Sequence, residues 1–406
     1  MVSIAHLSDC HLGYRAGKKV NENSINLREQ DGYDALEECI SQIIEEEIDL
    51  VVISGDLFHS AKPTMTCVSI ARDQLYRLAE KEIKTYIITG NHDTNDVRGD
   101  YSASAVLHNP LIGIYSYEEP LVVEEPVKGL KLWLLSHHNY KKQQETIKSI
   151  ELDEKDINIL VTHGSCYDEV VKGILTSRLE PREIVISEEL TSMPWDYSFL
   201  GHIHERGWVH SRDRVTDTSG RKQYYAGSLI RRGFADEEVY LGRGWTKWTV
   251  DLEKRTITPK MFSIHQRSQY DVRLDCSNKD VSDIERVIDF ELKRYNLKEE
   301  QPIFRLTLLD IDSDDIRRVV NWEKIKKRLY PCLTWQIRFE KTNNKGNEFE
   351  KIDFSKSHIF SESLEKSFQT FWKEIKVEIP KEDHKKVKEI SEEFLKRGIN
   401  QNLSGD

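Results

Sequence analysis

The sequence of 406 residues contains no apolar run long enough to span the hydrocarbon core of a bilayer, so we expect no transmembrane helix. Its first apolar stretch, Val2–Leu7, is too short for the hydrophobic region of a secretory signal and runs directly into polar residues. We therefore expect an intracellular protein of the cytoplasm or nucleoid that does not bind a membrane.

Cysteines are few and scattered along the chain. The six thiols never occur as a Cys-x-x-Cys pair, which argues against a zinc ribbon and against a disulfide scaffold. We expect them to be reduced, as is usual inside a cell. Cys10 lies between two polar residues, Asp9 and His11, and we expect its side chain to point away from them into the core.

The chain has no excess of positive charge, since 70 Asp and Glu residues outnumber 59 Lys and Arg residues and the formal net charge is −11. This balance does not favour a nucleic-acid-binding protein, although a local basic patch or bound metal ions can supply positive charge where it is needed. The Gly-x-x-x-x-Gly-Lys-Ser/Thr loop of P-loop ATPases is absent as well. Any dependence on ATP would therefore come from a partner protein.

Strands and helices alternate in the first part of the chain. Short aliphatic runs predict strands at Ser3–Leu7, Leu50–Ser54 and Thr85–Thr89, and helical spacing of apolar residues predicts helices at Leu27–Glu46 and from Pro63 onward. Later strand candidates are Leu130–Leu135, Ile157–Thr162, Tyr197–Leu200, Tyr224–Ser228 and Trp245–Asp251. This order predicts an α/β fold of layered sheets flanked by helices.

Polar side chains of one kind follow these strands. Any one of them alone would be an ordinary turn residue, but the carboxyl ends of parallel strands meet at one edge of a sheet. Their side chains are imidazoles, carboxylates and one amide, which are ligands for divalent ions. The residues are Asp9, His11, Asp56, His59, Asn91, His92, His163, His202 and His204.

Seven of these residues supply more donors than one tetrahedral zinc ion requires, namely Asp9, His11, Asp56, Asn91, His163, His202 and His204. Two ions about 3.5–4 Å apart, bridged by Asp56, would use them and still leave positions open for water and substrate. Mixed nitrogen and oxygen ligands without thiolate suit manganese, iron or zinc, and manganese is our first choice.

The motifs resemble those of the calcineurin-like metallophosphoesterase superfamily. They are, in order, Asp9-x-His11, Gly55-Asp56, Gly90-Asn91-His92-Asp93, His163-Gly164 and Gly201-His202-x-His204. Their longer forms, such as His6-Leu-Ser-Asp-x-His-Leu-Gly13 and Gly55-Asp-Leu-Phe-His59, resemble the SbcD / meiotic-recombination (Mre) nuclease family. This resemblance covers roughly residues 1 to 260.

The resemblance implies a four-layer α/β/β/α sandwich with two metal ions. Asp56 would bind both ions, the first together with Asp9, His11 and His204, and the second together with Asn91, His163 and His202. His92 would contact the scissile phosphate or protonate the leaving oxygen, and His59 would be a second substrate-side histidine. We also entertain the hypothesis that Asp93 orients His92.

Four segments are predicted. They are a nuclease domain (1–265), a small α/β capping domain that binds DNA (266–340), a linker (341–358) and a C-terminal helical hairpin (359–406). The hairpin carries an apolar stripe of Leu364, Phe368, Phe371, Trp372 and Ile375. The stripe could pack on its own chain, but the resemblance favours docking onto an SMC-like ABC ATPase of the SbcC/Rad type. The resemblance also implies a homodimer.

Basic residues in loops after the ligand-bearing strands could follow a DNA backbone. They are Arg15, Lys18, Lys19, Lys141, Lys142, Arg206, Arg231 and Arg232. The resemblance implies 3′-to-5′ exonuclease activity on duplex ends and endonuclease activity on single strands, in DNA repair or recombination. A phosphatase or small-molecule phosphodiesterase on the same fold, and a non-catalytic scaffold, are the alternatives.

Overall fold

The computed structural model describes residues 1–94, 102–115, 121–137, 145–166, 185–209, 222–232, 234, 242–311 and 320–341. The predictions for Lys141 and Lys142, for the linker beyond residue 341 and for the C-terminal hairpin lie outside these residues. The described chain forms two compact units, one of 1–272, 289–305 and 322–336, the other of 273–288, 306–321 and 337–341. The predicted domain boundary at residue 265 stays a prediction.

The first sheet has the strand order β14-β13-β1-β2-β3-β4. Its four parallel strands are β1 (Val2–Leu7), β2 (Leu50–Ser54), β3 (Lys84–Ile88) and β4 (Ile112–Tyr115), and two antiparallel strands follow on one side, β13 (Arg243–Asp251) and β14 (Thr256–Ile264). All five residues of β2 are buried, as the aliphatic run predicts for a strand covered on both faces.

The second sheet has the order β11-β12-β10-β7-β6-β5. Its centre is parallel and consists of β6 (Leu130–Leu135), β7 (Ile157–His163), β10 (Tyr197–Gly201) and β12 (Gln223–Tyr225). The edge strands, β5 (Leu121–Val127) and β11 (Gly207–Trp208), are antiparallel to their neighbours. A separate short pair joins β8 (Ser165–Cys166) to β9 (Val185–Ile186).

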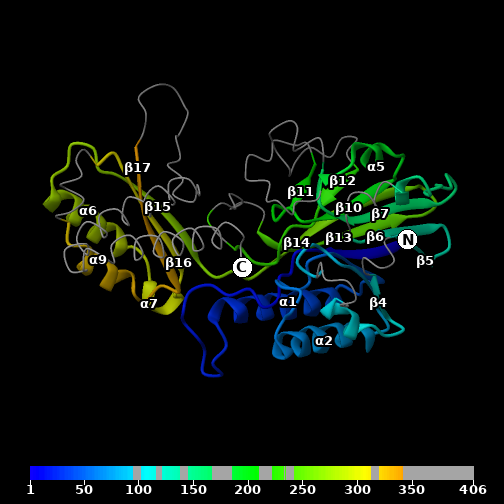
Figure 1. Ribbon diagram of the computed structural model, residues 1–406, viewed down its shortest axis with the longest axis horizontal. Helices are drawn as coiled ribbons and strands as arrows, with labels where there is room; N and C mark the ends of the chain where they lie inside the picture. The colour runs from blue at the N-terminus through cyan, green and yellow to red at the C-terminus, as the bar shows by residue number, and fades with distance from the viewer. Residues whose placement is uncertain are drawn as a thin grey trace, which may run out of the picture. The chain divides into compact units, whose positions relative to one another are not determined.

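The two sheets pack face to face between helices, and Figure 1 shows α1 and α2 on the outer side of the first sheet. Trp248 and Phe199 are fully buried in the core between the sheets. A second core joins the first sheet to α1 (Leu27–Glu45) and α2 (Met65–Ala79). On the far side, α5 (Glu188–Ser192) covers the second sheet through Leu190. The predicted α/β/β/α sandwich is confirmed.

Side-chain caps fix where the first two helices begin. Asn26 caps α1 by accepting the backbone N–H groups of Arg28 and Glu29. The prediction that Pro63 opens the second helix is wrong by two residues, because Thr64 caps α2 and accepts the N–H of Cys67 at 3.2 Å. A one-turn 3₁₀ helix, η1 (Ala103–Leu107), precedes β4.

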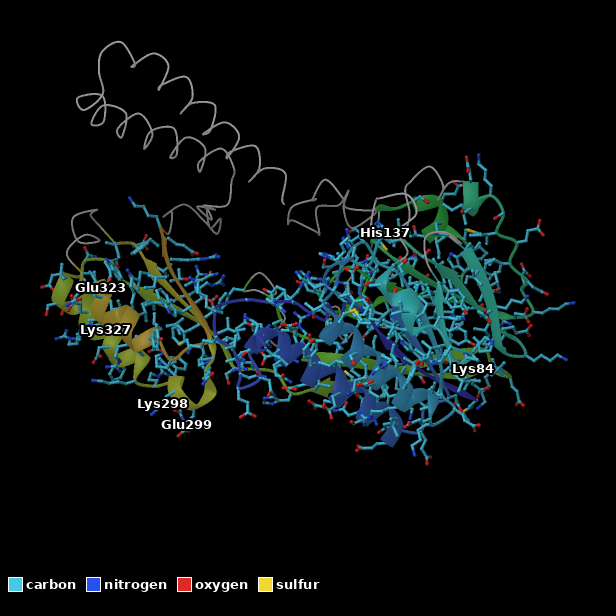
Figure 2. The ribbon with its side chains drawn as sticks, turned by 60° about the horizontal axis from the view of Figure 1, so that its bottom comes forward. Lys84, His137, Lys298, Glu299, Glu323 and Lys327 are labelled. Atoms are coloured by element: carbon cyan, nitrogen blue, oxygen red, sulfur yellow. The ribbon has the colours of Figure 1, made fainter. Side chains whose placement is uncertain are left out.

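Backbone hydrogen bonds join the carboxyl ends of the strands in both sheets. The N–H of Asp9, after β1, donates to Gly55 O after β2 at 3.1 Å. In the second sheet His163 and Gly201 are direct neighbours on β7 and β10. His137, after β6, donates its N–H to Thr89 O after β3 and so links the two sheets (His137 is labelled in Figure 2). The strand ends that carry the polar motifs therefore meet at one edge.

A three-stranded sheet follows, in the order β15-β16-β17. Its strands are β15 (Gln269–Asp275), β16 (Ile303–Leu309) and β17 (Thr334–Glu340), and its helices are α6 (Val281–Leu292), α7 (Leu297–Glu300) and α9 (Trp322–Leu329). Ile325 and Leu329 of α9 are buried, whereas Glu323 and Lys327 are exposed (Figure 2). Among the described residues of this region, no group of histidines and carboxylates has the spacing of metal ligands.

All six cysteines are buried, and none is paired in a disulfide. Cys10 packs in the core beneath the first sheet, and its burial raises the pKa of the thiol well above the usual value. Within the described part of the chain, no helix combines the length and the apolar character needed to cross a membrane.

Candidate metal centre

A first group of donors gathers at the end of β1. The Nε2 atom of His11 lies 3.7 Å from Asp9 Oδ1 and 3.5 Å from Asp56 Oδ2. His204, which follows β10, places its own Nε2 atom 3.1 Å from that of His11 and 3.8 Å from Asp9 Oδ1. Four side chains from three distant parts of the sequence therefore surround one point.

A second group lies beside it and shares Asp56. His163 Nε2 is 3.4 Å from Asp56 Oδ2 and 3.0 Å from Asn91 Oδ1, and His202 Nδ1 is 3.2 Å from the same Asn91 oxygen. The structure thus brings all seven predicted ligands together, and Asp9 also lies within donor range of Asp56 and His163. Their assignment to metal ions stays a prediction.

The spacing and chemistry of these donors fit divalent ions. Bonds of about 2.1 Å at right angles would place neighbouring donor atoms about 3 Å apart, close to the separations in both groups. Each group contains both nitrogen and oxygen donors. Among the described residues, no thiolate belongs to either group. Because Asp56 belongs to both groups, the arrangement suits two ions that share one carboxylate.

The surroundings shift the pKa values of the imidazoles in different directions. Burial and the nearby Arg232 lower the pKa values of His11 and His204 well below the usual value, so both rings are neutral and able to bind an ion. Burial also disfavours charge on His163, but Asp56 outweighs it and raises the pKa of His163 to about 9. His163 Nδ1 donates to Ser54 O at 2.8 Å, which turns Nε2 toward the donors.

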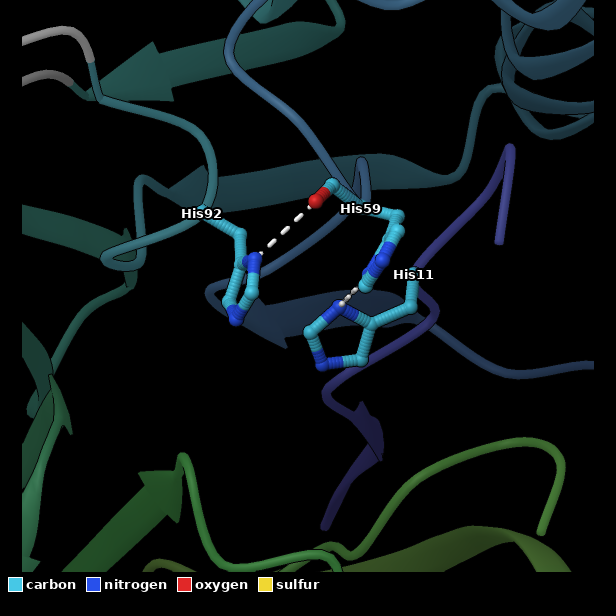
Figure 3. A group of neighbouring side chains, drawn as sticks. All are labelled: His11, His59 and His92. Atoms are coloured by element: carbon cyan, nitrogen blue, oxygen red, sulfur yellow. Dashed lines mark hydrogen bonds between the residues drawn. The ribbon is translucent and has the colours of Figure 1, made fainter. Parts of the chain in front are cut away.

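His59 and His92 form a stacked pair next to His11 (Figure 3). Nδ1 of His92 donates to the backbone oxygen of His59 at 2.9 Å, and Nδ1 of His59 lies 3.4 Å from Nδ1 of His11. Burial and Arg232 lower the pKa of His59 to about 4. The backbone N–H of His92 donates to Asp56 Oδ1 at 2.9 Å. This hydrogen bond links the stacked histidine pair to the shared carboxylate.

The hypothesis that Asp93 orients the His92 ring is wrong. The Asp93 carboxylate is buried and accepts three backbone N–H groups, from Leu57 at 3.2 Å, Phe58 at 2.9 Å and Gly90 at 3.0 Å. Burial and then Asp56 raise the pKa of Asp93 to about 7. Asp93 therefore fixes the two loops that follow β2 and β3.

We expect Asp93→Asn to weaken metal binding about 10- to 100-fold, because the amide NH₂ would face backbone N–H groups and loosen both loops. Titration of Mn²⁺ into the metal-free protein would measure this, with the exposed, Arg72-paired Asp73→Asn as the matched control. Manganese affinity equal to that of the control would show that Asp93 does not position the ligands.

Four of the ligand residues have strained backbones. Asp9, His11, Asp56 and His202 have positive φ angles of 49°, 44°, 53° and 94°, a conformation that costs energy for any residue other than glycine. Glycine is required next to them for a different reason. A Cβ atom on Gly90 would overlap Asp56 Oδ1, and the loop after β3 can come this close to the carboxylate only without one.

The predicted basic residues differ in their burial and in their contacts. Arg206 is 1% exposed and donates to the oxygens of Trp245, Phe262 and Gly242, so its prediction as a DNA contact is wrong. Arg15 pairs with Glu29, Lys19 donates to Pro331 O, and Lys18 is exposed, which leaves these three as predictions. Arg231 and Arg232 are half-buried, and Arg232 lies beside His204; Arg231 stays a prediction.

Sequence reasoning missed two residues of this centre. Ser8 donates its hydroxyl proton to Asp9 Oδ2 at 2.6 Å, and Tyr14 packs edge-on against His59 with ring centroids 5.1 Å apart. Ser8 could have been suspected from its place in the first motif. Nothing in the sequence indicates that Tyr14 meets a histidine 45 positions later in the chain.

Comparison with known proteins agrees with this geometry. Residues 2–206 match the family model of the calcineurin-like phosphoesterases. DNA double-strand break repair proteins Mre11 are similar over most of the chain: that of Saccharolobus solfataricus is 28% identical, covering 84% of this chain and 83% of its own, and that of Methanococcus maripaludis is 26% identical, covering 80% and 84%.

A dimetal phosphatase from Danio rerio aligns with a TM-score of 0.35 and 12% identity, over 61% of this chain and 92% of its own. Calcineurin-like phosphoesterases use a dinuclear divalent metal centre, and the two donor groups supply candidate ligands for one. The chain belongs to the calcineurin-like phosphoesterase family, in which it is a phosphodiester hydrolase similar to the Mre11/SbcD nucleases.

Proposed function

We propose that the protein is a nuclease that hydrolyses phosphodiester bonds of DNA at this centre, as a 3′-to-5′ exonuclease on duplex ends and an endonuclease on single strands. The observation that carries the proposal is the pair of donor groups sharing Asp56 with His92 directly beside them. Similarity to repair proteins supports DNA as the substrate.

Asp9, His11, Asp56 and His204 would hold one divalent ion, and Asp56, Asn91, His163 and His202 the other, with manganese as our first choice. Such ions neutralise the charge of the phosphate and make hydroxide available near neutral pH. The chain's own part is to keep these donors in place. It does so through hydrogen bonds such as those from the Ser8 hydroxyl to the Asp9 carboxylate and from His163 Nδ1 to Ser54 O.

His92 would protonate the leaving sugar oxygen. Its Nδ1–H donates to the His59 carbonyl, which leaves Nε2 as the atom that would carry the proton for the leaving group. An alkoxide is a poor leaving group, and a positioned acid lowers the barrier for its departure. His59, stacked on His92, would contact the substrate from the same side.

The proposal extends to the setting in which the protein acts and to its partners. It acts inside the cell on DNA in repair or recombination, as a homodimer with an SMC-like ABC ATPase of the SbcC/Rad type. The apolar stripe from Leu364 to Ile375 is the predicted contact with the ATPase, and the capping segment 266–340 together with Arg15, Lys18 and Lys19 would bind the DNA backbone.

The proposal is tested with end-labelled duplex DNA and circular single-stranded DNA, each with Mn²⁺, Mg²⁺ or EDTA, and with p-nitrophenyl phosphate in parallel. We expect manganese-dependent release of nucleotides from duplex ends and cleavage of the circle, both abolished by EDTA. Hydrolysis of the small ester with both DNA substrates intact would instead identify a phosphatase. Inactivity on every substrate, with metal bound, would identify a non-catalytic scaffold.

A further inference from the structure

One arginine reaches the metal centre from a loop that contributes none of the predicted ligands. Arg232 Nη2 lies 2.7 Å from Nε2 and 3.1 Å from Nδ1 of His204, and Nη1 lies 3.3 Å from Nδ1 of His59. The guanidinium thus spans the space between a predicted metal ligand and a predicted substrate-side histidine.

The loop that carries Arg232 is firmly anchored. Leu229 and Ile230 are buried in the core under α1, and the Ser228 hydroxyl donates to Ile230 O at 2.9 Å. The side chain of Arg28, only 3% exposed, donates to Arg231 O, and Tyr14 Oη donates to Arg232 O at 2.9 Å. The backbone from Ser228 to Arg232 is therefore held in one position.

Aromatic packing restrains the side chain as well. The Arg232 guanidinium carbon lies 5.9 Å from the ring centroid of Tyr14, the ring that packs edge-on against His59. An arginine fixed in this way loses little conformational entropy when it binds a ligand, because its planar donors already face one direction.

The net positive charge expected at the metal-loaded centre favours the binding of an anion. Two divalent ions and this guanidinium would bring five positive charges to the two ligand carboxylates, Asp9 and Asp56. A nitrogen lone pair of His204 that binds an ion cannot also accept a hydrogen bond from Arg232. The guanidinium would then lie between the bound ion and His59, within reach of an oxygen anion on the His59 side.

We propose that Arg232 is a catalytic residue of this centre and that its guanidinium binds a non-bridging oxygen of the substrate phosphate. The proposal rests on the proposed function only in taking that phosphate to belong to DNA. A guanidinium matches two phosphate oxygens with parallel N–H groups, and it stabilises the charge that builds on them during in-line attack.

Binding of inorganic phosphate to the manganese-loaded protein, measured by calorimetry, tests the proposal without relying on activity. We expect Arg232→Met to weaken phosphate binding about tenfold or more and Arg232→Lys to weaken it less, since lysine keeps the charge but not the paired donors. Manganese content and thermal unfolding of both variants should match the parent protein.

Arg255→Met is the matched control. This arginine donates to the carbonyls of Lys155 and Asp156 near the turn after β13, whose end pairs with the start of β1, away from the ligands. Phosphate affinity of Arg232→Met within twofold of this control would overturn the proposal. Loss of manganese together with phosphate would also overturn it, because Arg232 would then only support the ligands.

DNA cleavage separates this inference from the proposed function. If both hold, Arg232→Met should cut DNA about 10- to 100-fold more slowly than Arg255→Met at equal manganese occupancy. If the parent protein does not cut DNA while phosphate binding still depends on Arg232, the nuclease assignment fails and the anion site stands. Normal cutting by Arg232→Met would leave the nuclease assignment standing and refute the role of Arg232.

Discussion

Asp56→Asn should abolish metal binding and catalysis together, with cleavage of duplex DNA falling about 1,000-fold or more, equivalent to about 4 kcal/mol. The carboxylate belongs to both donor groups, at 3.5 Å from His11 and 3.4 Å from His163. An amide is uncharged and presents a single oxygen, so neither group keeps its shared anion. Mn²⁺ titration and the nuclease assay on the same preparation would measure both losses.

Asp49→Asn is the matched control for this change, because Asp49 lies at the opposite end of the same strand. Its carboxylate accepts hydrogen bonds from Ser3 N and Oγ at 2.7 Å and is remote from the ligands. We expect that control to bind manganese and cut DNA normally. Full manganese binding by Asp56→Asn would exclude a bridging role for this carboxylate.

His92→Asn should leave manganese binding intact and slow the cleavage of DNA about 100- to 10,000-fold. The asparagine amide can still donate to His59 O and so keep the loop in place, but it has no proton to give to the leaving oxygen. Cleavage of bis(p-nitrophenyl) phosphate should fall much less, since p-nitrophenolate leaves without protonation.

The exposed His265→Asn serves as the control for loss of a histidine. An equal loss on DNA and on the p-nitrophenyl ester would indicate that His92 binds the phosphate and is not the acid. Unchanged cleavage of DNA would remove His92 from the mechanism altogether.

The ligand set could be predicted from the sequence because its geometry follows from one rule. Parallel strands such as β1 and β2 end at the same edge, so residues that directly follow them meet whatever their separation in the chain. Strand β14 was not predicted, since Pro259 interrupts its pattern. Pro259 is tolerated because β14 lies at the edge of its sheet in the described part of the chain.

Side-chain direction was harder to predict than position. Asp93 stands beside His92 in sequence but faces backbone N–H groups, and Arg206 follows a metal motif but turns into the core. The contact of Tyr14 with Arg232 joins residues 218 positions apart through loops of irregular backbone. No periodicity relates such loops to one another, so only the folded structure can reveal the contact.

The left-handed backbone at Asp9, His11, Asp56 and His202 has a consequence for how this protein can evolve. At each of these positions glycine would relieve the strain, so relatives freed from selection for catalysis would gain folding stability by losing ligands. Divalent ions that bind only the folded chain would offset the strain, and the stability of the protein would rise with their concentration. Scarcity of metal in the cell would then lower the amount of folded protein as well as its activity.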